Sequence, residues 1–442
     1  MAERVAVVGL GVTGQSIVRH LKKENPSDEV VVLDTREPNA DLSREYADVD
    51  VRWESSELPA EHFDRIVVSP GLSMESCLMK GAVASDAPVV SDIDLFFESV
   101  KAPVIGITGT NGKSTVTSLV GHLLQGAGQN IGVGGNLGEA ALDLLAEDRD
   151  GYVLELSSFQ LERSCEQPFH AAAILNVSED HIDQHGSFER YKEAKNRILS
   201  HAKKTVSNRE DPNTGQGQVT FGSSQPSQDS EWGLVTQEGQ DHIAVGQELI
   251  VDVASLPLSG SHNVLNVMAA CALVDGMVAR GDMSGLLEDF HGLAHRFETV
   301  AVIEGVEFVD DSKATNVGAT VAALAGINTE NKMVLIAGGD AKGADLSPLV
   351  EALRGKAKCV VTIGVDGDKV ASCAESAGVA TVRASSLEEA VALASEHAIK
   401  GDMVLLSPAC ASLDMFANFR ERGQKFAEAV RAVKASIQED RA

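Results

Sequence analysis

Short apolar runs recur along the chain, and most are followed by glycine or small residues and then by a helical pattern. The runs lie at 5–9, 30–34, 65–71, 103–109, 152–158, 171–178, 333–339, 359–364 and 403–409. Continuous apolar strands that alternate with helices are typical of parallel sheets with helices on both faces. The pattern therefore predicts an α/β protein whose ligands bind where the strands end.

The runs group into three mostly parallel sheets, which we assign to domains at 1–91, 92–293 and 294–442. The length of 442 residues agrees with this division, since a domain commonly has about 150 residues. Within the second domain, the polar stretch 215–240 predicts an antiparallel or loop insertion. The third domain is predicted to close with a long helix from about Leu413.

A strand in the second domain leads into a glycine-rich loop and then into a helix with apolar spacing. The loop residues are Gly109, Thr110, Asn111, Gly112, Lys113, Ser114 and Thr115. Glycines let a backbone fold around phosphates, and the helix N-terminus adds a favourable dipole. Lys113 would then approach the outer phosphates of ATP, and the hydroxyl of Ser114 or Thr115 would bind magnesium. The spacing departs from G-x-x-x-x-G-K-[ST], because Ile107 lies five positions before Gly112, so a tight strand–helix turn is the alternative.

Two further positions after the loop are candidates for a metal site. Glu155 lies inside an otherwise apolar strand, and a buried carboxylate needs a partner such as magnesium, unless it is a satisfied core residue. His181 follows the next strand end, with other acidic and imidazole side chains nearby, and is either a metal ligand or a structural histidine. By pattern alone, Lys195 is a solvated lysine on a helix.

The N-terminus carries a second glycine motif, with Gly9, Gly11 and Gly14 between a strand and a helix. Asp34 ends the following strand, so the motif fits a dinucleotide, but a nucleotide-sugar diphosphate would use the same glycines and the same aspartate. A nicotinamide-dependent dehydrogenase is therefore an alternative, although such an enzyme has no use for a second nucleotide loop at 109–115. A glycine-rich turn without a ligand is the remaining interpretation.

The composition excludes several classes of partner. A formal net charge of −28 repels nucleic acid and anionic membrane surfaces. The cysteines Cys77, Cys165, Cys271, Cys359, Cys373 and Cys410 have no zinc-like spacing and are expected to be free thiols in a reducing compartment. Without a signal peptide or an apolar run of roughly 20 residues, the sequence predicts a cytoplasmic protein.

A series of motifs along the chain resembles the Mur ligase family, whose members build the peptide stem of bacterial peptidoglycan. The central and following motifs are TGTNGKST (108–115), LELSSFQLE (154–162), NVSEDHIDQHGS (176–187), YKEAKNRI (191–198), GSHNVLN (260–266), HRFE (295–298) and DDSKATN (310–316). Three more are GLGVTGQS (9–16), GGDAKGADL (338–346) and SPACASLDMFANFRERG (407–423). The resemblance covers essentially the whole chain. The D-N-P-R sequence of the diaminopimelate- or lysine-adding relatives is absent, which weighs against those members.

The resemblance implies three α/β domains, with Rossmann-like first and third domains and a P-loop-type central domain, for a UDP-substrate, ATP and an amino acid. It implies that ATP converts the terminal carboxylate of UDP-N-acetylmuramoyl-L-alanine to an acyl phosphate, which the amine of D-glutamate attacks. Magnesium, expected as two ions, would assist, and a monomer is expected. A folylpolyglutamate-type ligase of the same superfamily is the alternative, although the UDP-suited first domain argues against it.

The resemblance also implies roles for individual residues. For catalysis it implies Lys113, His181, Lys195 and Lys313, and for metal Ser114, Glu155, His181 and Lys195. For ATP it adds Asn263, Asn266, Arg296 and Asp311 to the loop, and for the UDP-substrate it implies Leu10, Thr13, Asp34, Thr35, Arg36, Ser69, Gly71, Asn136 and His181. For D-glutamate it implies Thr315, Lys342, Ser412 and Phe419. Lys195 aligns with a lysine that carbon dioxide carbamylates, which requires a neutral amine and hence a lowered pKa.

Overall fold

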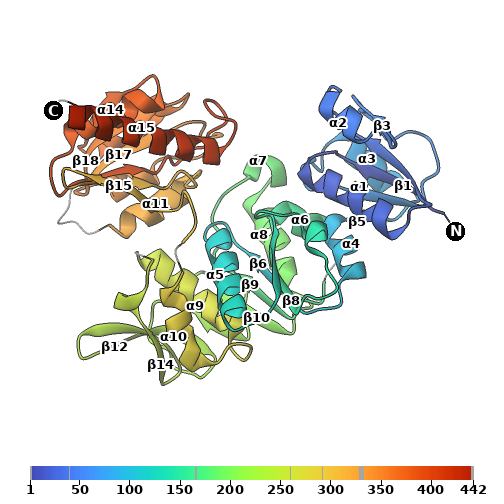
Figure 1. The fold of residues 1–442 in the computed structure, drawn as a ribbon, viewed down its shortest axis with the longest axis horizontal. Helices are drawn as coiled ribbons and strands as arrows, with labels where there is room; N and C mark the ends of the chain where they lie inside the picture. Colours follow the sequence, from blue (N-terminus) through green and yellow to red (C-terminus); the bar gives the residue numbers. More distant parts are fainter. Residues whose placement is uncertain are drawn as a thin grey trace. The chain divides into compact units, whose positions relative to one another are not determined.

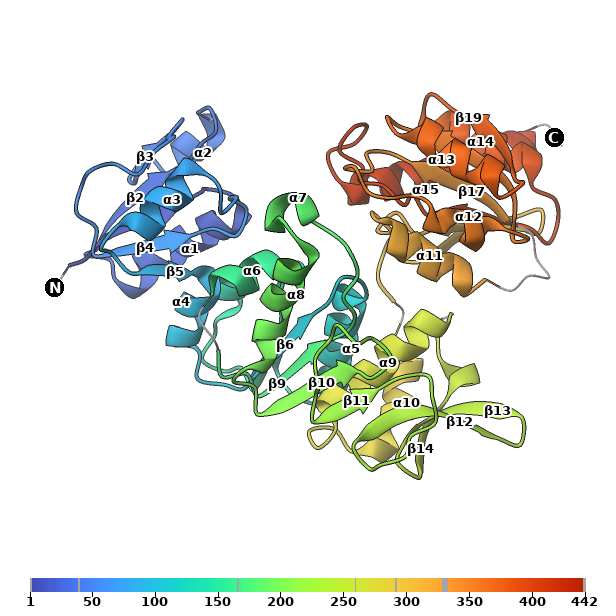
Figure 2. The same ribbon diagram turned by 180° about the vertical axis from the view of Figure 1, so that it is seen from behind.

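The chain forms two compact units in the computed structural model, which describes residues 2–38, 40–164, 167–258, 260–290, 292–327 and 333–439. The first unit comprises 1–255 and 265–288, and the second comprises 256–264 and 289–442. Figures 1 and 2 show three separate sheets, each covered by helices, as the α/β prediction requires. The bounds of the three domains stay a prediction.

The first sheet is fully parallel in the order β3-β2-β1-β4-β5. Its strands are β1 (Arg4–Val8), β2 (Glu29–Leu33), β3 (Asp50–Arg52), β4 (Arg65–Val68) and β5 (Val89–Ser91). The helices of this part are α1 (Val12–Glu24), α2 (Ala40–Glu45), α3 (Cys77–Ala84) and α4 (Asp92–Ser99). Apolar side chains of α1 pack on one face of the sheet and those of α3 on the other. The carboxyl ends of β1, β2 and β4 therefore meet at one edge, beside the start of α1.

The central sheet has the order β14-β13-β12-β11-β10-β9-β6-β8-β7. Its strands are β6 (Val104–Thr108), β7 (Ile131–Gly135), β8 (Gly151–Glu155), β9 (Ala171–Ile174), β10 (Lys204–Asn208), β11 (Val219–Phe221), β12 (Glu231–Gln237), β13 (Gln240–Val245) and β14 (Glu248–Asp252). Its helices are α5 (Lys113–Gly126), α6 (Ser158–Arg163), α7 (Ile182–His185), α8 (Phe188–Asn196), α9 (Ser261–Val274) and α10 (Arg280–Glu288), with single 3-10 turns at Ala141–Leu144, Arg197–Leu199 and Val253–Ser255. The strand β6 lies between β8 and β9, so the glycine loop after β6 emerges next to the ends of both neighbours.

The predicted insertion at 215–240 is partly antiparallel. The strand β11 pairs parallel with β10 and β12, whereas β12, β13 and β14 form an antiparallel ribbon at the edge of the sheet. This ribbon is visible at the far end of the yellow-green part of the chain in Figure 1.

The third sheet has the order β15-β16-β20-β17-β18-β19 and is parallel except for the β15–β16 pair. Its strands are β15 (Glu298–Ile303), β16 (Val306–Asp310), β17 (Met333–Gly338), β18 (Ala357–Ile363), β19 (Ala380–Arg383) and β20 (Met403–Leu406). Its helices are α11 (Val317–Ala325), α12 (Pro348–Leu353), α13 (Gly367–Ser376), α14 (Leu387–His397) and α15 (Phe419–Glu439). Side chains of α14 and α15 cover one face, and those of α11, α12 and α13 cover the other.

The apolar runs are confirmed as strands, with ends that differ by a few residues. The last helix begins at Phe419 rather than near Leu413. The cause is Asn418, whose side-chain oxygen accepts the backbone N–H groups of Arg420 and Glu421 at 2.9 and 3.0 Å and so caps the helix.

Two expectations drawn from composition can be compared with the described residues. No helix among them is long and apolar enough to cross a membrane. Cys77, Cys271, Cys359, Cys373 and Cys410 form no disulfide, and Cys165 lies outside the described residues.

Candidate active site

The glycine loop after β6 wraps into the start of α5, with Gly112 in the left-handed region at a φ of 82°. A side chain at Gly112 would collide with the amide of Asn266, so α9 packs directly against the loop. The backbone N–H groups of Thr110 and Asn111 both donate to Asn176, at 2.9 and 2.8 Å. The first half of the loop is therefore closed by the protein itself, and its helical end is the part that could offer backbone N–H groups to phosphates.

Two lysines converge on this loop. The ammonium groups of Lys113 and Lys195 each donate to the carbonyl oxygen of Gly109 at 2.8 Å, and Lys113 also donates to the carbonyl of Thr110 at 2.7 Å. Lys195 is only 2% exposed, so the solvated helix lysine expected from pattern alone is wrong. Burial, and then the charge of Lys113, hold the pKa of Lys195 well below its usual value. The lowered pKa favours the neutral form of the Lys195 amine.

Glu155 provides a negative charge at the end of β8, beside the loop strand. Its Oε1 accepts the side-chain N–H of Asn136 at 2.9 Å, while its buried Oε2 has no hydrogen-bond partner among the described residues. A buried carboxylate oxygen without a partner is costly unless a cation compensates it. Glu155 and the hydroxyl of Ser114, in the first turn of α5, therefore offer oxygen ligands of the kind that magnesium prefers.

His181 and His185 take different roles, although they are four residues apart in sequence. The ring of His185 is buried, stacks on Phe159 and shares a hydrogen with the hydroxyl of Ser158 at 2.9 Å, as a structural histidine does. His181 has a φ of 53° at the start of α7, and 38% of its side chain is exposed, beside Asp180. His181 is thus the histidine of this segment that a ligand could reach.

At the edge of the first sheet, Asp34 organises the glycine motif. Its two oxygens accept the N–H of Leu10 at 2.6 Å and the guanidinium of Arg36 at 2.8 Å. Burial alone would raise the pKa of Asp34, but the hydrogen bonds from Arg36 and Leu10 outweigh it and lower the pKa. The side chain of Leu10 is completely buried in the core, so only its backbone faces this edge, whereas the side chain of Val12 is 73% exposed.

The remaining candidates of the first domain lie at the same edge. Thr13 is the second residue of α1, Thr35 and Arg36 follow β2, and Ser69 and Gly71 follow β4. Ser69 is almost buried, and its N–H donates to the carbonyl of Val8 at 3.0 Å.

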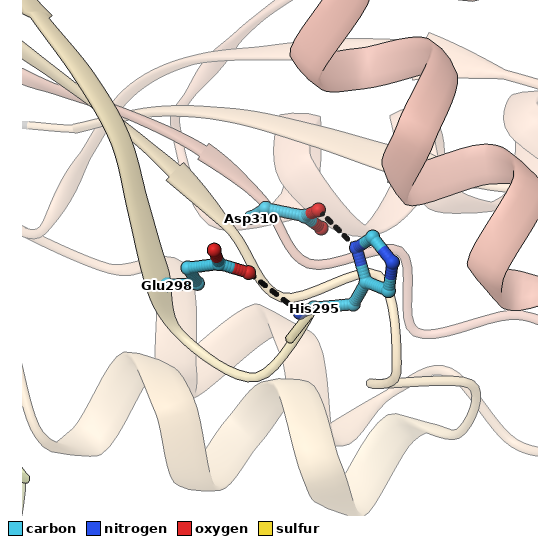
Figure 3. A group of neighbouring side chains, drawn as sticks. All are labelled: His295, Glu298 and Asp310. Carbon is cyan, nitrogen blue, oxygen red and sulfur yellow. Dashed lines mark hydrogen bonds and ion pairs between the residues drawn. The ribbon is translucent and has the colours of Figure 1, made fainter. Parts of the chain in front are cut away.

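In the second unit, the partly buried His295 pairs with the buried Asp310. Their Nδ1 and Oδ2 atoms lie 2.7 Å apart (Figure 3). The other oxygen of Asp310 accepts the N–H of Ser312 at 2.9 Å. Glu298 accepts the backbone N–H of His295 at 2.9 Å. His295 Nδ1, both oxygens of Asp310 and one oxygen of Glu298 thus have protein partners, and these bonds support the neighbouring loop. His295 also accepts the backbone N–H of Lys313 at 3.1 Å and thereby fixes that residue.

Several predicted residues of this unit lie together around Lys313. Its ammonium lies 4.0 Å from the ring centre of Phe419, and its carbonyl accepts the N–H of Thr315 at 2.8 Å. Asp311 accepts the hydroxyl of Ser407 at 2.8 Å, and burial raises the pKa of Asp311 to about 7. Arg296 is beside His295 in sequence, and its positive charge partly offsets the effect of burial on the pKa of Asp311.

Lys342 and Ser412 belong to two other loops of the same sheet. Lys342 is exposed at a φ of 50° and donates its N–H to Asp340 at 2.8 Å, while Ser412 is nearly buried. A backbone bridge between Asp340 and Ala411 holds these loops side by side.

Arg422 has a structural role that the sequence did not reveal. It is 1% exposed and donates to the hydroxyl and carbonyl of Ser312 at 3.0 and 2.8 Å and to the carbonyl of Cys410 at 3.2 Å. Burial lowers its pKa to about 10. The sequence signal that could have indicated this role is the position of Arg422, three residues after Phe419 on the same helix face.

Gly423 permits this arrangement, because a side chain there would collide with His295 and would come within 2.7 Å of Asp310. We expect Gly423→Ala to lower the free energy of unfolding by about 1–3 kcal/mol, as overpacking does. Gly285→Ala in α10 is the matched control, since nothing lies within 4 Å of its added methyl group, and it should stabilise by up to about 1 kcal/mol. Urea unfolding of both variants checks the prediction, and equal stabilities would contradict it.

Comparisons with known proteins agree over the whole chain. The family "Mur ligase MurD-like, N-terminal domain" matches residues 3–91, "Mur ligase middle domain" matches 107–274, and "Mur ligase, glutamate ligase domain" matches 295–410. A UDP-N-acetylmuramoylalanine–D-glutamate ligase of Legionella pneumophila (strain Paris) is 42% identical over 97% of this chain and 98% of its own. The protein of that name from Pseudomonas aeruginosa is 44% identical over 96% and 97%.

A solved structure also shares the fold. The UDP-N-acetylmuramate-alanine ligase of Thermotoga maritima superposes with a TM-score of 0.64 at 21% identity, over 98% of this chain and all of that one. The three family matches and the full-length relatives give one conclusion: the chain belongs to the Mur ligase family.

Proposed function

We propose that this Mur ligase joins D-glutamate to UDP-N-acetylmuramoyl-L-alanine and consumes ATP, in the synthesis of a peptidoglycan precursor. The observation that carries the proposal is the identity of 42–44% with ligases of that name over at least 96% of both chains. The products are the amide, ADP and phosphate.

The reaction needs ATP because a bare carboxylate is a poor electrophile. Transfer of the γ-phosphoryl group to the carboxylate of the nucleotide sugar gives an acyl phosphate and ADP. The amine of D-glutamate then attacks the acyl carbon, and the tetrahedral intermediate expels phosphate as the amide forms. Lys113, which lies on the phosphate loop, would neutralise charge on the transferring group.

Magnesium fits the groups around the loop. Ser114 and Glu155 would hold an ion on the phosphates, and His181 and a carbamylated Lys195 would hold a second. The metal would supply positive charge opposite the phosphate oxygens. Carbamylation forms a bond from the Lys195 nitrogen to carbon dioxide with loss of one proton, and the lowered pKa of the amine favours it.

The amino acid and the other substrates have candidate partners of suitable chemistry. Lys342 is a cation for a carboxylate of D-glutamate, with Thr315, Ser412 and Phe419 as its neighbours in the predicted pocket. Lys313 would approach the reacting centre, and Asn136 would contact the muramyl part. The adenine side would meet Asn263, Asn266, Arg296 and Asp311.

For the UDP part we propose the edge of the first sheet, where α1 presents its N-terminus to a diphosphate. The candidates at this edge are Leu10, Thr13, Asp34, Thr35, Arg36, Ser69 and Gly71. We further propose domains at 1–91, 92–293 and 294–442, and a cytoplasmic monomer that does not bind nucleic acid.

The deciding experiment measures phosphate release from ATP with UDP-N-acetylmuramoyl-L-alanine and magnesium. D-Glutamate is compared with L-glutamate, D-aspartate, L-lysine and diaminopimelate. We expect release that requires both the nucleotide sugar and D-glutamate. Release with another amino acid would move the chain to another member of the family, and release only with a folate acceptor would favour the folylpolyglutamate-type alternative.

A further inference from the structure

Asn176 lies directly after β9 and beside the phosphate loop. Its side-chain oxygen accepts the N–H of Asn111 at 2.8 Å, and its side-chain N–H donates to the carbonyl of Asn111 at 3.0 Å. Its own carbonyl accepts the N–H of Thr110 at 2.9 Å. One asparagine therefore satisfies three backbone groups in two successive residues of the loop.

Thr110, in the loop, makes the reciprocal contact with the backbone of Ser178, two residues after Asn176. The hydroxyl of Thr110 donates to the carbonyl of Ser178 at 3.1 Å and accepts the N–H of Ser178 at 3.0 Å. With its single hydrogen given to Ser178, the same hydroxyl accepts from the phenol of Tyr191 at 3.0 Å. The side chain of each segment thus pairs with the backbone of the other, and the loop is bound to residues 176–178 at two points.

This pairing fixes which part of the loop can face phosphates. The N–H groups of Thr110 and Asn111 point to Asn176, so the helical end of the loop presents the phosphate-binding donors. A loop held in this shape before the nucleotide arrives loses little conformational entropy on binding. Without the pairing, ATP binding would have to order the loop at a cost in affinity.

We propose that Asn176 is a positioning residue that holds the phosphate loop in its nucleotide-binding shape and ties it to the segment that leads to His181. The proposal rests on the ATP site of the proposed function. It predicts an effect on nucleotide affinity, because Asn176 acts on the shape of the loop.

The test compares Asn176→Ala with Asn208→Ala. Asn208 ends the neighbouring strand β10, is partly buried like Asn176, and bonds backbone groups of Glu210 and Leu175, outside the loop. For Asn176→Ala we expect KM for ATP and Kd for Mg·ADP to rise roughly tenfold to thirtyfold, as the loss of two hydrogen bonds implies. The KM for D-glutamate and the kcat at saturating ATP should change by less than about threefold.

Asn176→Asp separates positioning from folding. It keeps the acceptor for the Asn111 N–H but places a carboxylate oxygen against the Asn111 carbonyl, so the KM for ATP should rise here too. This isosteric variant decides the matter if Asn176→Ala does not fold. An unchanged KM for ATP and Kd for Mg·ADP, or equal rises in Asn208→Ala, would overturn the proposal.

The binding measurement also distinguishes failure of the inference from failure of the proposed function. If the wild-type protein binds Mg·ADP but releases no phosphate with D-glutamate, the proposed reaction fails, and the affinity of Asn176→Ala still tests the inference. If the wild type is active and the variant keeps wild-type affinity, the inference alone fails.

Discussion

Lys113→Met is expected to lower the rate of ATP-dependent phosphate release by about a thousandfold or more, which corresponds to roughly 4 kcal/mol of transition-state stabilisation. The ammonium group of Lys113 lies within 2.8 Å of two loop carbonyls, at Gly109 and Thr110, where outer phosphates would be expected to bind. Methionine keeps the length and most of the packing of the side chain but removes the charge. The measurement is phosphate release with saturating nucleotide sugar and D-glutamate.

Lys204→Met is the matched control, because Lys204 is also a partly buried lysine of the central sheet that donates to a backbone carbonyl, that of Asp275 at 2.9 Å. It lies at the start of β10, the end of the strand opposite the loop side. Its rate should remain within about threefold of wild type. Similar rates for the two variants would show that Lys113 does not act on the phosphates.

The fold was predictable because parallel strands buried on both faces leave a strong apolar signal. The runs before Gly9, Gly109 and Gly339 each proved to be a strand whose end carries a loop with functional candidates. The ribbon β12–β14 was less clear, since its strands are partly exposed and contain polar residues. Sequence patterns report burial of a face, and an edge ribbon buries little.

The site was predictable only where a motif is local. Lys113 follows its loop in sequence, whereas Lys195 reaches the same carbonyl from a helix more than eighty residues away. Nothing in the helix pattern marks that burial, and the family resemblance alone indicated it. Side-chain direction was the other obstacle, because Leu10 and Val12 are equivalent in a glycine-rich string but point to the core and to solvent respectively.

Residues that fix the positions of other residues were the hardest to predict from the sequence. Arg422 has no carboxylate partner in its hydrogen bonds and acts through backbone groups of Ser312 and Cys410, which come from distant loops. Such contacts depend on tertiary structure, so spacing within the sequence does not encode them.

Lys195→Met is expected to lower the rate of phosphate release by about a thousandfold or more. The variant protein should be at least as stable as the wild type. The activity would fall because the carbamate that the amine would form is lost. The stability would hold because burial disfavours the charged form of the Lys195 amine, and methionine avoids that cost. Urea unfolding at pH 7 in bicarbonate-free buffer measures the stability, and phosphate release measures the activity.

The lowered pKa of Lys195 also predicts how the stability difference between the wild type and Lys195→Met changes with pH. Between the folded pKa of Lys195 and its unfolded value near 10.5, the unfolded chain binds one more proton, so the stability of the wild type rises with pH. The advantage of Lys195→Met should therefore shrink from pH 7 towards pH 10. Lys192→Met, on the same helix but partly exposed and paired with Glu189 at 3.4 Å, should stay active.

Bicarbonate supplies the last distinction between a structural and a chemical role for Lys195. Wild-type protein dialysed without carbon dioxide and magnesium should lose activity and regain it when bicarbonate is added, because the carbamate would re-form on the neutral amine. Lys195→Met should not respond. A wild type that is indifferent to bicarbonate, together with a variant that unfolds more easily, would mean that the buried ammonium supports the loop through the Gly109 carbonyl instead.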